Sequence, residues 1–69
     1  MVKKYASRGM AERMGALASR NATTKGEFSQ FAMVRPMDGG MYHVGPVNEI
    51  GVEFPSAPLL VQWSGGYRC

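Results

Sequence analysis

Few side chains in this 69-residue chain are of the types that catalyse reactions. The candidates are Asp38, His43, Glu49, Glu53 and Cys69. General acid–base and nucleophilic catalysis require a reactive group within hydrogen-bond reach of a partner inside a pocket. His43 lies in an expected strand, and Cys69 lies just beyond Gly65-Gly66, where no element is expected to hold it. A chain of this size also offers little material for a ligand pocket of about 300 Å³ or more. We therefore predict that the protein is not an enzyme.

Metal ions and phosphate-carrying cofactors are not predicted either. One histidine and one cysteine make a poor ligand set for a metal. The two Gly-Gly pairs lack the glycine spacing and the following helix that bind nucleotide phosphates, so they are expected in turns. No cofactor is expected.

The chain carries no sequence signal for membrane insertion or secretion. Its longest apolar run, residues 57–61, includes a proline and is far shorter than the roughly 18 residues that span a bilayer. No apolar segment follows the basic N-terminus. A single cysteine cannot form an internal disulfide, which fits a reducing compartment. We expect a cytoplasmic protein without membrane contact, or one within a particle assembled inside the cell.

Charge is distributed unevenly along the chain. Residues 1–25 contain six of the eight basic residues and one acid, Glu12, which gives this segment a charge of +5. The remaining residues carry −2, and the whole chain +3. Such asymmetry predicts an electrostatic docking surface at one end of the molecule. Residues 1–25 are called the basic head below.

The basic head contains one predicted helix, over about residues 6–21. Its apolar residues recur at spacings of four, four and three, as on the inner face of an amphipathic helix. These residues are Ala6, Met10, Met14 and Leu17. Ser7 is expected to cap the start of the helix, and Asn21 to end it in the left-handed conformation.

Beyond residue 27 the apolar period changes to two, which is typical of strands. Strands are expected at residues 28–34, 41–44, 49–54 and 59–63. The first presents apolar side chains on both faces, which implies a strand covered on both sides. Asp38-Gly39-Gly40 predicts the turn of a hairpin. In the third strand, Ile50, Val52 and Phe54 are expected to point inward.

These elements predict an α+β fold in a single domain over residues 1–69. One N-terminal amphipathic helix packs on a small antiparallel sheet, a meander of three or four strands. The β region covers residues 28–64, and residues 65–69 form a C-terminal tail.

Protein docking is the predicted function. Methionine side chains adapt their shape at contact surfaces, and Met37 and Met41 flank the predicted turn, whereas Met10, Met14 and Trp63 are expected in the core. The predicted partner-binding residues are Arg8, Arg13, Arg20, Met37, Met41 and Tyr42. In its size and its lack of a catalytic set, the chain resembles small virus-encoded or mobile-element proteins that decorate a particle or block a host enzyme. We predict an accessory or structural subunit that docks onto a larger protein or nucleoprotein assembly.

Binding to nucleic acid, or inhibition of host nucleic-acid machinery, is the alternative. Cations neutralise phosphates and an exposed aromatic ring stacks on bases. The residues predicted for these contacts are Lys3, Lys4, Tyr5 and Arg8. Against this alternative, the cations surround the predicted helix instead of forming one stripe, and no nucleic-acid-binding motif is present.

Overall fold

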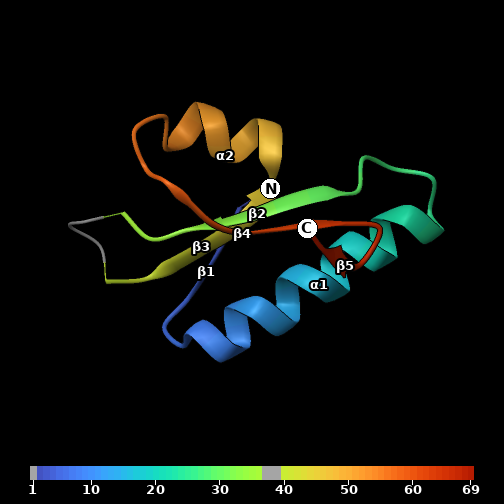
Figure 1. The fold of residues 1–69 in the computed structure, drawn as a ribbon, viewed down its shortest axis with the longest axis horizontal. Coiled ribbons are helices and arrows are strands. Elements are labelled where there is room, and N and C mark those ends of the chain that lie inside the picture. Colours follow the sequence, from blue (N-terminus) through green and yellow to red (C-terminus); the bar gives the residue numbers. More distant parts are fainter. Residues whose placement is uncertain (1, 37–39) are drawn as a thin grey trace.

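The computed structural model describes residues 2–36 and 40–69, which form one antiparallel sheet between two helices (Figure 1). In chain order the elements are β1 (Lys3–Tyr5), α1 (Arg8–Thr24), β2 (Gln30–Val34), β3 (Tyr42–Pro46), α2 (Val47–Glu53), β4 (Leu59–Ser64) and β5 (Tyr67–Arg68). The strands lie in the order β1-β3-β2-β4-β5. The predicted α+β class, with an N-terminal helix on an antiparallel sheet, is confirmed. The sheet has five strands instead of three or four, and a second helix is present. The predicted meander is wrong, because β4 pairs with β2 and not with β3, the strand before it in the chain.

Two crossovers explain why the helices cover opposite faces of the sheet. β1 and β2 both run antiparallel to β3, so the unit β1-α1-β2 joins two parallel strands with one strand between them. The unit β3-α2-β4 does the same across β2. Crossovers of this kind are almost always right-handed. Both connections cross the sheet in the same direction, but they start from strands that run in opposite directions. Right-handed connections of this kind therefore place α1 and α2 on opposite faces of the sheet (Figure 1).

The start of α1 follows the prediction, whereas its end does not. The Oγ of Ser7 accepts a hydrogen bond from the main-chain nitrogen of Met10 at 3.4 Å, as an N-cap does. The helix continues past Asn21 to Thr24, and the chain leaves it at Gly26, whose φ is +73°. Glycine adopts such a φ without steric cost, so Gly26 and not Asn21 ends the helix.

The predicted inner face of α1 is wrong. The buried residues of this helix are Ala11, Gly15, Ser19 and Ala22. Met10 and Leu17 are instead 46% and 38% exposed. The reason is the large ring of Trp63, which occupies the space beside Gly15 and leaves no room there for a larger side chain. Met14 is half-buried. Trp63 itself is buried, as predicted.

The predicted strand at residues 49–54 is also wrong, because this segment lies within and just after α2. Val47, Ile50 and Phe54 recur at spacings of three and four, and they pack together against the sheet. Ile50 is fully buried as expected, but Val52 is 81% exposed. The alternation of Ile50, Val52 and Phe54 is thus compatible with a strand. The side chains that pack on the sheet are those spaced as in a helix.

The core has one part on each face of the sheet. Towards α1 it consists of Ala11, Met33, Val44, Val61 and Trp63. Towards α2 it consists of Ala32, Val34 and Ile50. Neighbouring residues of β2 contribute to both parts, which confirms that this strand is covered on both faces.

Substitutions in α2 test its helical assignment. Ile50→Ala should lower the free energy of unfolding by about 2–5 kcal/mol, because it opens a cavity in the core. Val52→Ala should change it by less than about 0.5 kcal/mol, because Val52 is exposed. Urea denaturation measures both values. An equal decrease in the free energy of unfolding at the two positions would support a strand at residues 49–54 and contradict the helix.

Two glycine substitutions test the packing of α1 on Trp63. Alanine stabilises a helix by about 1 kcal/mol relative to glycine, but a Cβ at Gly15 would overlap the Trp63 ring, and overpacking costs about 1–3 kcal/mol. Gly15→Ala should therefore lower the melting temperature. The matched control is Gly51→Ala in α2, where no atom lies within 4 Å of the added methyl group, and this change should raise it. A rise in both variants would mean that α1 lies farther from the sheet.

Candidate docking surface

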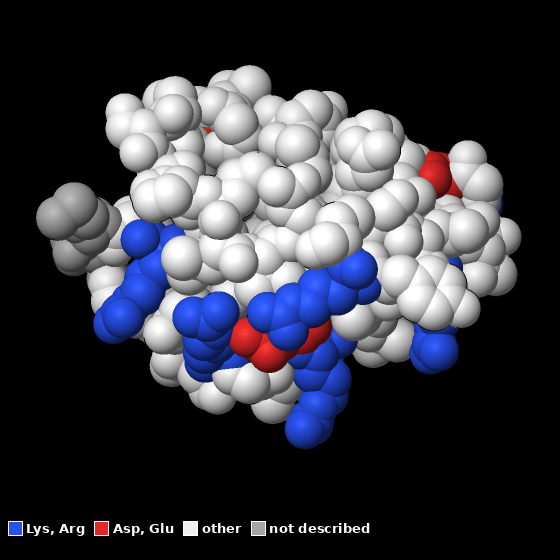
Figure 2. Space-filling model, viewed as in Figure 1, with Lys and Arg blue, Asp and Glu red and all other residues white. Residues whose placement is uncertain are grey.

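Four exposed arginines lie on α1 and on the neighbouring strand β5. These residues, called the basic band below, are Arg8, Arg13, Arg20 and Arg68. The first three lie on α1, and Arg68 reaches the same side of the molecule because it is the register partner of Trp63, whose ring packs on that helix. Figure 2 shows Lys and Arg side chains gathered over α1 and β5 around one acidic patch.

The turn between β4 and β5 is held directly against α1. The main-chain nitrogen of Gly66 donates a hydrogen bond to the Oγ of Ser19 at 2.9 Å. A Cβ at Gly66 would lie 2.7 Å from the Cβ of Arg20, and the φ of Gly66 is +87°. Only glycine allows this approach at this backbone conformation. The turn therefore brings Arg68 alongside the three arginines of the helix.

Glu12 is the acid within the basic band. Its Oε2 lies 2.9 Å from the Nε of Arg8, and the two residues of this ion pair are one helical turn apart. The hydrogen bond from Arg8 lowers the pKa of the Glu12 carboxyl below its ordinary value, and the charge of Arg68 lowers it further. Glu12 therefore stays ionised at neutral pH and neutralises one of the four cations. The band keeps a net positive charge.

Arg68 is not among the site residues predicted from the sequence, because residues 65–69 are expected to form a tail. Gly65 and Gly66 both have positive φ and form a two-residue turn, after which Tyr67 pairs with Ser64. Gly-Gly between two strand-like segments is a known hairpin signal. That signal was present in the sequence at residues 64–67, and it identifies β5.

The residues predicted for nucleic acid do not share one surface. Lys3 and Tyr5 line a groove of about 300 Å³ between α1 and the sheet, together with Met14 and Leu17. Lys4 alternates with them along β1 and is the register partner of His43, so it lies on the α2 side. The fourth predicted residue, Arg8, belongs to the basic band.

The predicted hairpin tip is described only in part. Met37, with Asp38 and Gly39, lies outside the described residues. Met41 is half-buried, and Tyr42 packs against the core on the α1 side. The guanidinium of Arg35 lies 5.1 Å from the centre of the Tyr42 ring, which is close enough for a cation–π contact. Partner binding by Met37, Met41 and Tyr42 stays a prediction.

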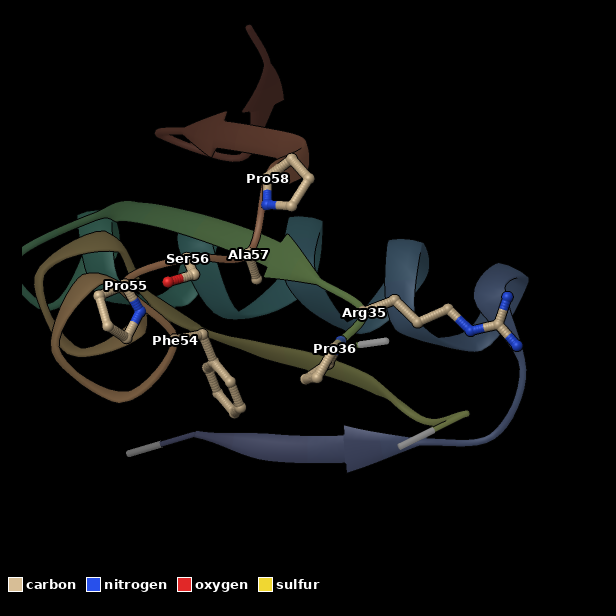
Figure 3. A pocket seen from close by; sticks show the side chains of 7 residues that line it. All are labelled: Arg35, Pro36, Phe54, Pro55, Ser56, Ala57 and Pro58. Atoms are coloured by element: carbon tan, nitrogen blue, oxygen red, sulfur yellow. The ribbon is translucent and has the colours of Figure 1, made fainter. Parts of the chain in front are cut away.

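An apolar pocket of about 350 Å³ lies between the end of β2 and the connection from α2 to β4 (Figure 3). It is lined by Arg35, Pro36, Phe54, Pro55, Ser56, Ala57 and Pro58. The expectation that the chain is too small for a pocket of this size is therefore wrong. Figure 3 shows the Arg35 side chain extending away from the prolines, so the walls offer apolar contact without a directed charge.

Of the candidate catalytic residues, three lie on or beside α2, and Cys69 lies after β5. Glu49 and Glu53 lie one turn apart on α2, His43 lies on β3 beside the ring of Phe54, and Cys69 is exposed after β5. Within residues 2–36 and 40–69, no three His, Cys, Asp or Glu side chains come close enough to hold a metal ion. In the same residues, no helix has the length and apolar character needed to cross a bilayer.

No protein-family model matches the chain, and neither the curated proteins nor the solved structures contain a match to it.

A pH titration tests the arrangement around Glu12. The pKa of this carboxyl should rise towards its ordinary value in Arg8→Ala, and by a smaller amount in Arg68→Ala, when its side-chain carbon resonance is followed by NMR. The pKa of Glu12 is lower in the folded protein than in the unfolded chain. The Arg8–Glu12 pair therefore stabilises the fold at neutral pH, and this stabilisation is lost as the pH falls through the folded-state pKa of Glu12. An unchanged pKa in Arg68→Ala would show that β5 does not lie beside Glu12.

Proposed function

We propose that this protein is a non-enzymatic docking subunit, and that its basic band binds an acidic protein surface of a larger assembly. The observation that carries the proposal is the one-sided charge of the fold. Four arginines with one acid lie on the α1 side, whereas Glu49 and Glu53 lie on α2, across the sheet. Guanidinium groups match carboxylates in bidentate geometry, which makes arginine well suited to acidic protein partners.

The rigidity of the scaffold supports this role. Residue Ser19 of α1 is joined by hydrogen bonds to Ser29 before β2 and to Gly66 before β5. The arginines thus project from elements whose backbone positions are set before a partner arrives. Such preorganisation lowers the entropy cost of association, and a one-signed surface speeds the encounter with an oppositely charged partner.

Binding to a nucleic acid has less support. A continuous track of phosphates requires cations along one path, but Lys4 lies on the side of the sheet opposite Lys3 and Arg8. The proposal fits a reducing cytoplasm, or a particle assembled there, as the place where such a subunit acts.

Charge variants test the proposal with a simple acidic probe. Poly-L-glutamate of about 20 residues serves as the acidic polypeptide, and a random DNA duplex of equal charge as the competitor. Arg68→Glu should weaken binding to polyglutamate by about tenfold, which corresponds to about 1.4 kcal/mol. Glu12→Gln should strengthen it. Lys4→Glu makes the same change in net charge on the α2 side and should have less than about a twofold effect. Isothermal titration calorimetry measures all three.

The duplex separates the two function classes. A protein that binds nucleic acid loses duplex affinity steeply with salt, with a slope near 0.9 per phosphate contact. Tight, steeply salt-dependent duplex binding with no affinity for polyglutamate would replace the proposal with the nucleic-acid alternative. Equal effects of Lys4→Glu and Arg68→Glu would show that net charge, and not the basic band, governs binding.

A further inference from the structure

One row of apolar side chains on α1 faces away from the sheet. Met10, Met14 and Leu17 recur at spacings of four and three, so they lie one above another on the same flank of the helix. Met10 and Leu17 are exposed, and Met14 is half-buried. The face that packs on the sheet is a different one, formed by the small residues of the helix. The three larger side chains, called the exposed row below, are therefore a second apolar face of α1.

A groove of about 300 Å³ runs beside the exposed row, between α1 and the sheet. The helix contributes Met14, Leu17, Ala18 and Asn21 to its lining. These residues span about two turns of one flank of the helix. The sheet contributes the rings of Tyr5 and Phe31. Because Met14 and Leu17 belong to both features, the exposed row and the groove form one continuous apolar surface.

Basic side chains border this surface on both sides. Lys3 lies on the side of the sheet, where it lines the groove. On the other side, Leu17 also lines a shallow hollow that contains Arg13 and Arg20. Among the described residues, none that lines the groove or the hollow is acidic. The complementary partner surface is a row of apolar side chains with carboxylates on both sides of it.

We propose that an acidic amphipathic helix of the partner docks along the exposed row, with its apolar side chains in the groove and its carboxylates beside Lys3, Arg13 and Arg20. Helices that bind grooves do so through apolar side chains at spacings of three and four. The exposed row has these spacings, so the ridges of one helix pack between those of the other. Its two methionines adapt their shape to the partner. This inference rests on the proposed function, because it gives the acidic partner of the basic band a conformation and a position.

Charge argues against a second copy of the chain as the occupant. Each copy carries a net charge of +3, and two exposed rows in contact would bring the arginines of both copies together, which costs affinity. The acidic helix α2 does not match the row either. In the described part of α2, Val52 is the one large apolar side chain that is exposed. A single side chain does not fill a groove that follows two helical turns.

The test uses a synthetic peptide of about 18 residues, a length at which helices form. It consists of alanine, glutamate and leucine, with the leucines at spacings of three and four and the glutamates on both sides of them. A control peptide of the same composition has its leucines spread around the helix. In isothermal titration calorimetry, the first peptide should bind the protein at least about tenfold more tightly than the second. The amide signals of Tyr5, Met14 and Leu17 should shift in ¹⁵N NMR spectra.

Two leucines of matched exposure locate the site. Leu17 is 38% exposed in the row, and Leu60 is 39% exposed on β4. Leu60 alternates with Val61, which packs on the α1 side, so Leu60 lies on the α2 side of the sheet. Leu17→Gln should weaken binding of the first peptide by about tenfold, and Leu60→Gln by less than about twofold. Met10→Gln provides a second variant in the row and should also weaken it.

The same variants separate this inference from the proposed function. None of the three substitutions changes the charge of the protein, so binding of polyglutamate should stay the same in all of them. Circular dichroism verifies their fold. Failure of polyglutamate and the peptides alike would refute the proposed function. Binding of polyglutamate without a preference between the two peptides would refute only the helix.

Three further results would overturn the inference. Equal effects of Leu17→Gln and Leu60→Gln would place the peptide away from the exposed row. Self-association in analytical ultracentrifugation that Leu17→Gln abolishes would assign the row to a second copy. Binding to phosphatidylglycerol vesicles that Leu17→Gln abolishes, without binding of either peptide, would assign the row to an anionic lipid surface.

Discussion

The close contact between Gly15 of α1 and the ring of Trp63 in β4 is the packing constraint on which the rest of the structure depends. A methyl group at Gly15 would occupy the space of the ring, so the helix lies as near to the sheet as its backbone allows. At that distance the hydroxyl of Ser19 reaches two other segments. Its Oγ donates to the carbonyl of Ser29 at 2.6 Å and accepts from the nitrogen of Gly66 at 2.9 Å. One buried side chain thus ties α1 to the start of β2 and to the turn before β5.

The same packing shapes the outer surface. Because α1 turns its small residues inward, its larger side chains remain in contact with solvent, Met10 and Leu17 among them. The arginines of the helix are exposed for the same reason. The hydrogen bond to Gly66 then places Arg68 beside Glu12, so the basic band includes a residue from the other end of the chain.

The two helices cover the sheet unequally. Among the described elements, α1 packs on all five strands, whereas the short α2 packs on β2 and β3. β5 pairs with only the last part of β4. Leu59 and Leu60 of β4 are partly exposed, and they line the same shallow hollow as Arg68.

The sequence by itself determined the features that depend on neighbouring residues. The period of two identifies β2, Ser7 marks the start of α1, and the uneven charge of residues 1–25 indicates a basic surface.

Tertiary structure decided the rest. Residues 49–54 fit two periods, and a segment so short becomes a helix because it must cross from β3 to β4. The buried face of α1 could not be predicted from hydrophobicity, since the ring of Trp63, distant in sequence, leaves no room for a side chain at Gly15 and so brings the small residues of the helix against the sheet. Arg68 joined the basic band for the same physical reason, because its position depends on a turn packed against a helix more than 40 residues earlier in the chain.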